Sequence, residues 1–546
     1  MRAKSGNPSR SGGFEHPAAF WFGVLACTAG VLLHLPMYIG ARDMHYHLRG
    51  MRPDTPMIVG MALIGVGLAA VLYGLIPRGT SAIVESAARI RVRTLDDAPV
   101  NRQHVALLVV MALAVTIDVM KPTALAFVAP GFAQEYGLKS PGNPHGHTPV
   151  SWLPLTGIAG TVIGSWLWGW LGDRIGRRAS IILAGVLFVT TSICGAMPGF
   201  GWNLLMCFFM GIGAGGMLPI TFTLMAETIP ARHRGWLMVL IGGDIAGAYV
   251  ITSWLSGALT PTYSWRILWL ISLPTGLLLL LLNHWIPESP RYLLARGRRR
   301  EADAVMRRYG ATAEEEPARE AEIERDVDRV GWATLMRRPL AAPTLAITVL
   351  GIGVGLMTYG FQLWVPTNLQ RLGYSTVNSD YVIRNAAVLG LPLTVLCAWM
   401  YGVWGSRKTI VTVTAVTGAT LLGFVIAGGS LAHHRPALSL LLVVPLSGVS
   451  SVVAVVAGYA AEIYPTLVRS RGTGLAAGMT KAGGVLILAL TVAAASVPSI
   501  SLTALLGAVP LLLAAVLFLW IGPETKARPL EDIGQEVMRG GRAGAG

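Results

Sequence analysis

The chain has 546 residues, of which 53% are hydrophobic and only 13% are charged, and its mean hydropathy is +0.58. This composition excludes an ordinary soluble domain, because a soluble domain needs a polar surface. The formal net charge of +15 does not indicate nucleic-acid binding. The basic residues lie mostly in short loops between apolar runs, where the positive-inside rule places them.

Features that often mark enzymes or metal sites have ordinary interpretations here. No pair of cysteines has the spacing of a metal or redox site, so we interpret all four as packing residues within apolar runs: Cys27, Cys194, Cys207 and Cys397. Two histidine pairs in predicted loops do not indicate a metal: His45 with His47, and His145 with His147. The sequence contains no nucleophile–base pair and no phosphate-binding loop, so we expect neither enzyme activity nor a cofactor.

Fourteen apolar runs are long enough to cross a membrane, since about 20 residues span the hydrocarbon core. Two come first, near 18–40 and 57–76, and the first is too long for a cleavable signal peptide, which predicts a retained helix. The other twelve lie near 104–130, 150–171, 179–198, 202–226, 236–259, 265–286, 341–369, 381–404, 408–429, 437–461, 473–497 and 502–522.

Loop charge predicts the orientation. The N-terminus, the segment 287–340 and most loops on the same side are rich in Arg and Lys, whereas the loops SPGNPHGHTP and GGSLAHHRP are poor in them. We therefore expect both termini in the cytoplasm, although the loop 41–56 carries three arginines on the predicted outer side. Abundant Arg, Ala and Gly with little Lys favour a bacterium with a GC-rich genome, so we expect the bacterial inner membrane.

Three pairs of short motifs recur in the same order at nearly one spacing. The pairs begin at Gly169 (GWLGDRIGRR) and Gly402 (GVWGSRK), at Glu227 and Glu462, and at Pro287 and Pro523, which are 233, 235 and 236 positions apart. This spacing predicts a duplicated six-helix unit. The expected domains are an extension with two membrane helices (1–103), a six-helix bundle (104–286), cytoplasmic loop helices (287–340), a second bundle (341–522) and a tail (523–546).

These motifs carry a family resemblance. GWLGDRIGRR resembles the signature of the major facilitator superfamily, and PESPRYLLARGR, PETK and the two Glu–Pro–Arg boxes resemble its sugar-porter branch. TYGFQLWVPTNL is similar to the niacin, organic-cation and synaptic-vesicle-glycoprotein relatives, and to the aromatic-acid/proton symporters. The resemblance covers residues 104–533 and implies an all-α major facilitator fold. The chain departs from it at Cys207, where many relatives have an Arg tied to proton coupling, and at Ser406, which replaces the Asp of the second charged motif.

The charged motifs are the predicted gate. Gly169 and Gly172 would let two helices approach closely, and Asp173 would then pair with arginines or with a helix N-terminus. The resemblance implies a cytoplasmic latch that favours the outward-open state. We expect clasps between Glu227 and Arg234 and between Glu462 and Arg469. The complete predicted gating set is Gly169, Gly172, Asp173, Arg174, Gly176, Arg177, Arg178, Glu227, Arg234, Glu288, Arg291, Glu462, Arg469 and Glu524. The alternative is that these charges only mark the cytoplasmic ends of the helices.

A charged residue inside a predicted span costs about 2.5–3.5 kcal/mol at mid-helix and therefore usually faces a cavity or a partner, and we single out four such residues. They are Asp118, Lys121, Asp244 and Lys481. Asp118 matches an acidic position common among the relatives named above and is our candidate for the proton-coupling group. Lys481 would bind a carboxylate, or pair with an acid when the site is empty. A fixed structural ion pair, and snorkelling of Lys121 to the interface, stay open as alternatives.

The seventh core helix adds four polar or aromatic side chains, Tyr359, Gln362, Trp364 and Asn368, and we expect Pro366 to bend it. These groups would suit a planar or carboxylated ligand. Anchoring at the membrane interface is the alternative.

The sequence therefore predicts a secondary active transporter that moves a small organic solute by alternating access, with an organic or aromatic acid as the favoured substrate and protons as the coupling ion. We expect a monomer in lipid with no nucleic-acid partner. A multidrug or metabolite exporter is one alternative, although the fourteen-span exporters of this superfamily place their extra helices between the halves. A non-transporting receptor with a transporter-like fold is the other.

Overall fold

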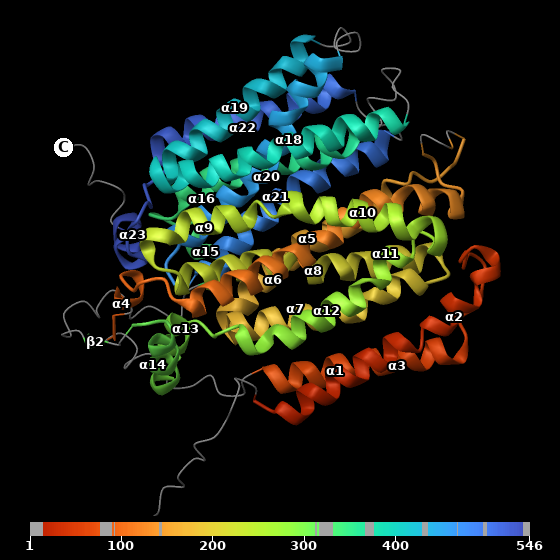
Figure 1. Cartoon of the computed structure of the whole chain (residues 1–546), viewed down its shortest axis with the longest axis horizontal. Helices are drawn as coiled ribbons and strands as arrows, with labels where there is room; N and C mark the ends of the chain where they lie inside the picture. Colours follow the sequence, from red (N-terminus) through yellow and green to blue (C-terminus); the bar gives the residue numbers. More distant parts are fainter. Residues whose placement is uncertain are drawn as a thin grey trace, which may run out of the picture.

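The structure is a computed structural model of the chain, and it describes residues 15–76, 90–91, 93–140, 143, 145–296, 298–311, 314–315, 331–365, 376–427, 435–466, 468–494 and 499–538. Helices make up almost all of the regular structure (Figure 1). The described residues form one antiparallel strand pair, β1 (Ile90–Arg91) with β2 (Glu314–Glu315). The predicted all-α class is confirmed.

The first helices are α1 (Pro17–Leu32), α2 (Leu35–Gly40), η1 (Arg42–Met44) and α3 (Thr55–Leu75). α1 and α3 lie side by side along the edge of the molecule and pack on α7 (Figure 1). Glycines make this pair close: a Cβ added at Gly60 would lie 2.6 Å from the carbonyl oxygen of Gly30. Small residues at such contacts let helix backbones approach closely and pack by van der Waals contact. This packing holds the helices together in lipid, where no hydrophobic driving force acts between them.

A first set of helices, which we call the N-terminal group, runs from α5 to η4. Its members are α5 (Arg102–Tyr136), α6 (Trp152–Ile175), α7 (Arg177–Thr191), η3 (Ser192–Ala196), α8 (Phe200–Thr228), α9 (Ala231–Gly242), α10 (Ile245–Tyr263), α11 (Ile267–Leu270), α12 (Ser272–Leu281) and η4 (Leu282–Trp285). α9 and α10 together make one long apolar path that is interrupted at Gly243 and Asp244. The Asn101 side chain caps α5 by accepting hydrogen bonds from two backbone amides of its first turn.

A second set, the C-terminal group, runs from α16 to α22. Its members are α16 (Ala341–Leu356), the π-helical turn η6 (Met357–Phe361), η7 (Gln362–Trp364), α18 (Thr376–Val403), α19 (Ser406–Ala427), α20 (Arg435–Ile463), α21 (Arg469–Ala494) and α22 (Ile500–Ile521). Short helices gather at one end of the molecule, on the left of Figure 1: α4 (Arg93–Asp96), α13 (Pro290–Ala295), α14 (Arg299–Arg308), α15 (Trp332–Leu335) and α23 (Leu530–Met538). We call this end the network end.

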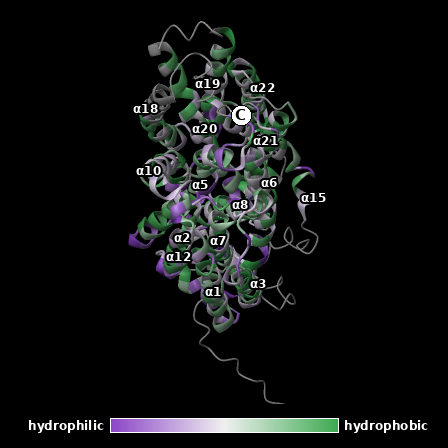
Figure 2. Ribbon diagram, turned by 90° about the vertical axis from the view of Figure 1, so that its right-hand side faces the viewer, coloured by the Kyte–Doolittle hydropathy of each residue, from purple (hydrophilic) through white to green (hydrophobic). Residues whose placement is uncertain are grey.

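Within the described residues, twelve helical stretches are long and apolar enough to cross a membrane. They fill twelve of the fourteen predicted ranges. The other two ranges also hold helices, namely α6, whose final turn is charged, and α18, in which the shorter stretch Val388–Val403 is apolar. Apolar side chains cover the outer surface, including exposed Trp254, Ile426 and Leu440, and Figure 2 shows hydrophobic residues along most helices. Such a surface suits lipid rather than water.

The two groups lie beside each other with their long helices running in similar directions (Figure 1). Most of one buried apolar cluster belongs to the N-terminal group and most of a second belongs to the C-terminal group. Between the groups, α6 packs on α21, α9 packs on α18 and α8 packs on α20. The domain boundaries predicted from the sequence stay a prediction.

The close packing of α1 on α3 is testable with two glycines of the same helix. Gly60→Val should force α1 and α3 apart, at a cost of about 1–3 kcal/mol for overpacking. Gly65→Val carries the same loss of helix propensity, but a Cβ at Gly65 meets no atom within 4 Å. Hydrogen–deuterium exchange of the purified protein should therefore be faster in 17–32 and 55–75 for the first variant only. Equal exchange in the two variants would contradict the packing.

Candidate functional site

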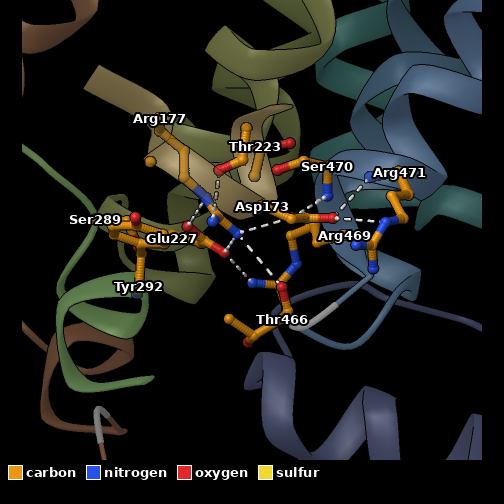
Figure 3. Close-up of polar contacts among 12 residues, drawn as sticks. Asp173, Arg177, Thr223, Glu227, Ser289, Tyr292, Thr466, Arg469, Ser470 and Arg471 are labelled. Carbon is orange, nitrogen blue, oxygen red and sulfur yellow. Dashed lines mark hydrogen bonds and ion pairs between the residues drawn. The ribbon is translucent and has the colours of Figure 1, made fainter. Parts of the chain in front are cut away.

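A buried carboxylate joins the two groups at the network end. Glu227, at the end of α8, is completely buried and receives two guanidinium groups (Figure 3). Arg177 Nε lies 3.0 Å from Glu227 Oε2, and Arg469 Nη1 lies 2.8 Å from Glu227 Oε1. Arg177 comes from α7 in the N-terminal group and Arg469 from α21 in the C-terminal group. One carboxylate therefore holds charges from both groups in a place that excludes water.

Asp173 makes the second connection between the groups. Its carboxylate accepts hydrogen bonds from the backbone N–H groups of Ser470 and Arg471, each at 3.2 Å (Figure 3). These amides belong to the first turn of α21, where backbone donors are unpaired and the helix dipole attracts an anion. The sequence predicted such a partner for Asp173. The contact depends on small residues, because a Cβ at Gly169 would lie 2.7 Å from the Ser470 carbonyl oxygen.

Glu288 caps the neighbouring helix. Its carboxylate accepts hydrogen bonds from the backbone N–H of Arg177 at 2.8 Å and of Arg178 at 3.4 Å. Gly176 has a φ of 99°, and a Cβ there would lie 2.4 Å from Glu288 Oε2, so both the conformation and the space require glycine. Burial raises the pKa of the Glu288 carboxyl, although its backbone donors and the Arg177 charge oppose the rise.

Two arginines of the first motif have local roles. Arg178 donates from Nε to the side-chain oxygen of Asn283 at 2.9 Å. Arg174 lies over the ring of Trp170, 5.0 Å from its centre, and its backbone carbonyl accepts hydrogen bonds from Tyr292 and Arg296. Of the arginines in this motif, Arg177 is therefore the one that reaches Glu227.

The second half repeats the capping arrangement and corrects the alignment of the motifs. Glu524 accepts hydrogen bonds from the backbone N–H of Ser406 at 2.8 Å and of Arg407 at 3.3 Å. Gly405 has a φ of 102°, and a Cβ there would lie 2.5 Å from Glu524 Oε2. Gly405 is therefore the counterpart of Gly176, 229 positions earlier. Matching the first glycines of the two motifs was wrong by four residues, because each short motif contains several glycines.

The corrected alignment changes which residue is lost in the second half. Ser406 stands where Arg177 stands, and Gly402 stands where Asp173 stands. The second motif therefore lacks the arginine as well as the aspartate. Its Ser406 hydroxyl donates to Glu524 at 2.9 Å instead of reaching across to the other group.

The predicted clasps exist with exchanged partners. Glu227 pairs with Arg469 at 2.8 Å, and Arg234 lies 3.5 Å from Glu462. The prediction that each glutamate pairs with the arginine of its own motif was wrong. The two motifs face each other across the interface between the groups, so each glutamate meets the arginine of the other copy. This exchange turns two local contacts into two connections between the groups.

Asp96 is a member of this network that the sequence analysis missed. Its carboxylate is buried and lies 2.7 Å from Arg234 Nη1 and 2.9 Å from Arg291 Nη2. Arg291, a member of the predicted gating set, pairs with Asp96 and also donates to the backbone oxygen of Glu227 at 3.0 Å. Asp96 lies in the segment before the first core helix, which the repeat places outside the transporter core. The hint in the sequence is an acidic pair within an arginine-rich stretch.

A buried polar cluster lies along α5 and α21. Asp118 and Lys121 are each 5% exposed, and the charges of Lys481 and Lys121 both act on the Asp118 carboxylate. Within the part of the chain that the structure describes, Asp118 Oδ1 and Lys121 Nζ have no hydrogen-bond partner. Asp118 belongs to the N-terminal group and Lys481 to the C-terminal group, so this pair also spans the interface.

Lys121 and Asp244 point to other places. Lys121 Nζ lies 4.9 Å from the centre of the Phe188 ring, and Lys121 lines a cavity of about 20 Å³ that Trp269 and Thr252 share. That cavity is inside the N-terminal group and has room for about one water molecule. Asp244 lies at the break between α9 and α10 and accepts a hydrogen bond from the Thr116 hydroxyl of α5.

The aromatic residues of the seventh core helix lie at an irregular stretch. Tyr359 belongs to the π-helical turn η6 and packs on Gly484 of α21 so tightly that a Cβ there would lie 2.2 Å from the Tyr359 ring. Trp364 is buried, its Nε1 has no hydrogen-bond partner among the residues that the structure describes, and it packs in the same apolar cluster as parts of α5. Gln362 begins η7. Asn368, with Pro366, lies outside the described residues. π-helical turns are frequent at functional sites.

At the end opposite the network end, the extension binds a buried ion pair. Glu135 Oε1 lies 2.6 Å from Arg266 Nη2 and accepts hydrogen bonds from the backbone N–H groups of Leu48 and Arg49. Arg49 also donates to the Glu135 carbonyl oxygen at 3.0 Å. The arginine-rich loop 41–56 that fits the charge rule badly therefore has at least one arginine with a specific partner.

The described arrangement defines a multi-pass membrane transport protein with two groups of helices that are connected by ion pairs. The chain belongs to the sugar (and other) transporter family, whose model matches residues 124–537, and thus to the sugar-porter-like branch of the major facilitator superfamily. It is a secondary transporter of a small solute and not an enzyme.

Known proteins of this family align over most of the chain. It is similar to the niacin transporter NiaP of Acinetobacter baylyi, with 25% identity over 456 residues that cover 81% of this chain and 99% of that protein. It is 30% identical over 396 residues to the inner membrane metabolite transport protein YgcS of Escherichia coli, covering 69% and 83%. The proton:xylose symporter XylE bound to 6-bromo-6-deoxy-D-glucose superposes with a TM-score of 0.65 and 20% identity over 79% of this chain and 98% of XylE.

The central position of Glu227 predicts a large effect on stability. Glu227→Gln should lower the free energy of unfolding by about 3–5 kcal/mol, because two buried guanidinium groups lose their shared carboxylate. Glu301→Gln is the matched control, since its pair with Arg298 is about half exposed and is worth about 0–1 kcal/mol. Thermal unfolding of the purified proteins in detergent measures the difference. Equal melting temperatures for the two variants would show that Glu227 is not the central contact.

Proposed function

We propose that the protein carries a small organic acid together with protons, by alternating access at a site between the N-terminal and C-terminal groups. The observation that supports this most is the pair of opposite charges formed by Asp118, which is buried on α5, and Lys481, which is partly buried on α21 and interacts electrostatically with Asp118 across the interface. A buried ionisable residue in a membrane protein usually serves a substrate, an ion or a partner charge.

The network end supplies the gate. Opening there has to separate Asp173 from the first turn of α21, Glu227 from Arg469, and Glu462 from Arg234. Each contact consists of a few charge-assisted hydrogen bonds whose groups can be satisfied by water once the end opens. In the structure these contacts are made, so the network end is closed.

We infer that the network end faces the cytoplasm of a bacterial cell and that both termini lie on that side. The support is the distribution of Arg and Lys over the loops, together with the placement of α13, α14 and α23 at this end. The closed network end then corresponds to a carrier that is open or occluded toward the outside. The predicted gating set acts as the inner gate.

An acid substrate follows from the charges at the interface. The Lys481 ammonium is a compact cation on a flexible stem, which suits a carboxylate, and Tyr359 and Trp364 offer aromatic surface nearby on the seventh core helix. The niacin transporter NiaP of Acinetobacter baylyi agrees in kind, since niacin is an aromatic carboxylic acid. When the site is empty, Asp118 takes the place of the substrate carboxylate as the counter-charge of Lys481.

Proton coupling is assigned to Asp118. At the position where many relatives have an arginine, Cys207 is buried and its Sγ lies 3.6 Å from the Leu153 carbonyl oxygen as a packing contact. That position offers no cation here. A proton on Asp118 would free Lys481 to bind the substrate, and release of the substrate would restore the pair of Asp118 and Lys481. The movement of the proton is thereby linked to the movement of the substrate.

A ligand screen tests the substrate class. Nicotinate, benzoate, organic amines and sugars are added to the purified protein, and the melting temperature is measured. We expect stabilisation by aromatic carboxylates, and we expect Lys481→Met to lose it while keeping the fold. Stabilisation by sugars or amines alone, or an undiminished response to carboxylates in Lys481→Met, would contradict the acid assignment.

The coupling assignment is tested by Asp118→Asn in proteoliposomes loaded with the best acid from the screen. Asparagine cannot take up a proton, so accumulation driven by a proton gradient should be abolished while exchange of labelled for unlabelled acid persists. Asp97→Asn, at an exposed carboxylate, should behave like the unmodified protein. Undiminished accumulation in Asp118→Asn would show that the proton travels elsewhere.

A further inference from the structure

Asp96 holds two arginines that the gate needs. Its Oδ1 lies 2.7 Å from Arg234 Nη1 and its Oδ2 lies 2.9 Å from Arg291 Nη2, and all three side chains are buried. Asp96 ends α4, in the extension that precedes the six-plus-six helices of the repeat. The extension thus places a carboxylate inside the charge network of the network end.

Arg234 divides its contacts between the two groups. Toward the C-terminal side it lies 3.5 Å from Glu462 and donates to the carbonyl oxygen of Arg528 at 2.6 Å. Toward its own side it contacts Asp96 at 2.7 Å and the carbonyl oxygen of Ala226 at 3.5 Å. Asp96 therefore makes the shorter of the two carboxylate contacts to Arg234.

The two kinds of partner have different fates when the network end opens. Glu462 and Arg528 move away with the C-terminal group, and Arg234 keeps only the partners on its own side. A buried guanidinium that loses its carboxylate is strongly destabilised, so without Asp96 the open state would carry an unpaired charge. With Asp96 present, Arg234 stays neutralised in both states.

We propose that Asp96 is a positioning residue that stays paired with Arg234 and Arg291 throughout the transport cycle and so stabilises the state in which the network end is open. This proposal rests on the proposed alternating access. The proposal gives the extension a role in transport. The extension supplies the carboxylate that pairs with Arg234 on the side of the N-terminal group, where the core motifs supply none.

The proposal predicts opposite signs for two neighbouring carboxylates. Glu462→Gln removes a partner that exists only in the closed state and should favour opening. Asp96→Asn removes a partner present in both states but indispensable in the open one, where Glu462 no longer compensates, and should favour closure. A carboxylate that only supports the fold would not shift the balance between the two states toward closure.

The experiment measures distances at the network end by double electron–electron resonance. Spin labels are attached at Arg174→Cys and Lys408→Cys, two exposed positions on opposite groups, and the four natural cysteines are buried. Compared with the doubly labelled parent protein, Glu462→Gln should enlarge the long-distance population, and Asp96→Asn should reduce it at least twofold. Asp97→Asn, the exposed neighbour, should leave it unchanged, and Asp96→Glu should restore much of it.

Other outcomes overturn the proposal in distinguishable ways. A shift of Asp96→Asn toward longer distances, or no shift while Glu462→Gln behaves as expected, would overturn the role of Asp96 alone. No effect of Glu462→Gln either would show that this end does not open, and the proposed function would fail with it. If Asp96→Asn does not fold, the triple variant Asp96→Asn/Arg234→Gln/Arg291→Gln should match the double variant Arg234→Gln/Arg291→Gln, because both arginine partners of Asp96 are then absent. A difference between those two would overturn the proposal.

Discussion

The contact on which the rest of the structure depends is the buried carboxylate of Glu227 between Arg177 and Arg469. It pairs with one charge from each group at a fully buried position, so it stabilises the closed arrangement and makes any partial separation costly. The neighbouring contacts follow from it. Asp173 reaches the first turn of α21 because α6 and α21 are close, and they are close because glycines line that contact.

The network has an internal symmetry that is incomplete. Glu288 and Glu524 cap α7 and α19 in the same way, and each requires a glycine with positive φ beside it. Only the first charged motif, however, sends an aspartate across the interface, from Asp173 to the first turn of α21. The second motif has kept the cap but has Gly402 and Ser406 in place of Asp173 and Arg177, so the contribution of the two motifs is asymmetric at this end.

Sequence reasoning gave the helices and most of the network members, because apolar length and repeated motifs are properties of the chain itself. It failed where the answer depends on the pairing of distant segments. Glu227 and Glu462 each pair with the arginine of the other motif because the two motifs meet in the folded protein. This pairing cannot be predicted from either motif alone. Asp96 and the Glu135–Arg266 pair were missed for the same reason, since each carboxylate meets its arginine only after the chain folds.

The claim that the groups alternate is tested most directly by measuring both ends of one protein. One label pair is placed at the network end (174 and 408), and a second pair is placed at the opposite end at the exposed positions Trp202 and Leu502. Distances are recorded with and without an acid that stabilises the protein. If the two groups rock about a central site, the distance at one end lengthens as the distance at the other shortens. If both distances stay fixed, or lengthen and shorten together, the groups do not alternate and the network end is not a gate.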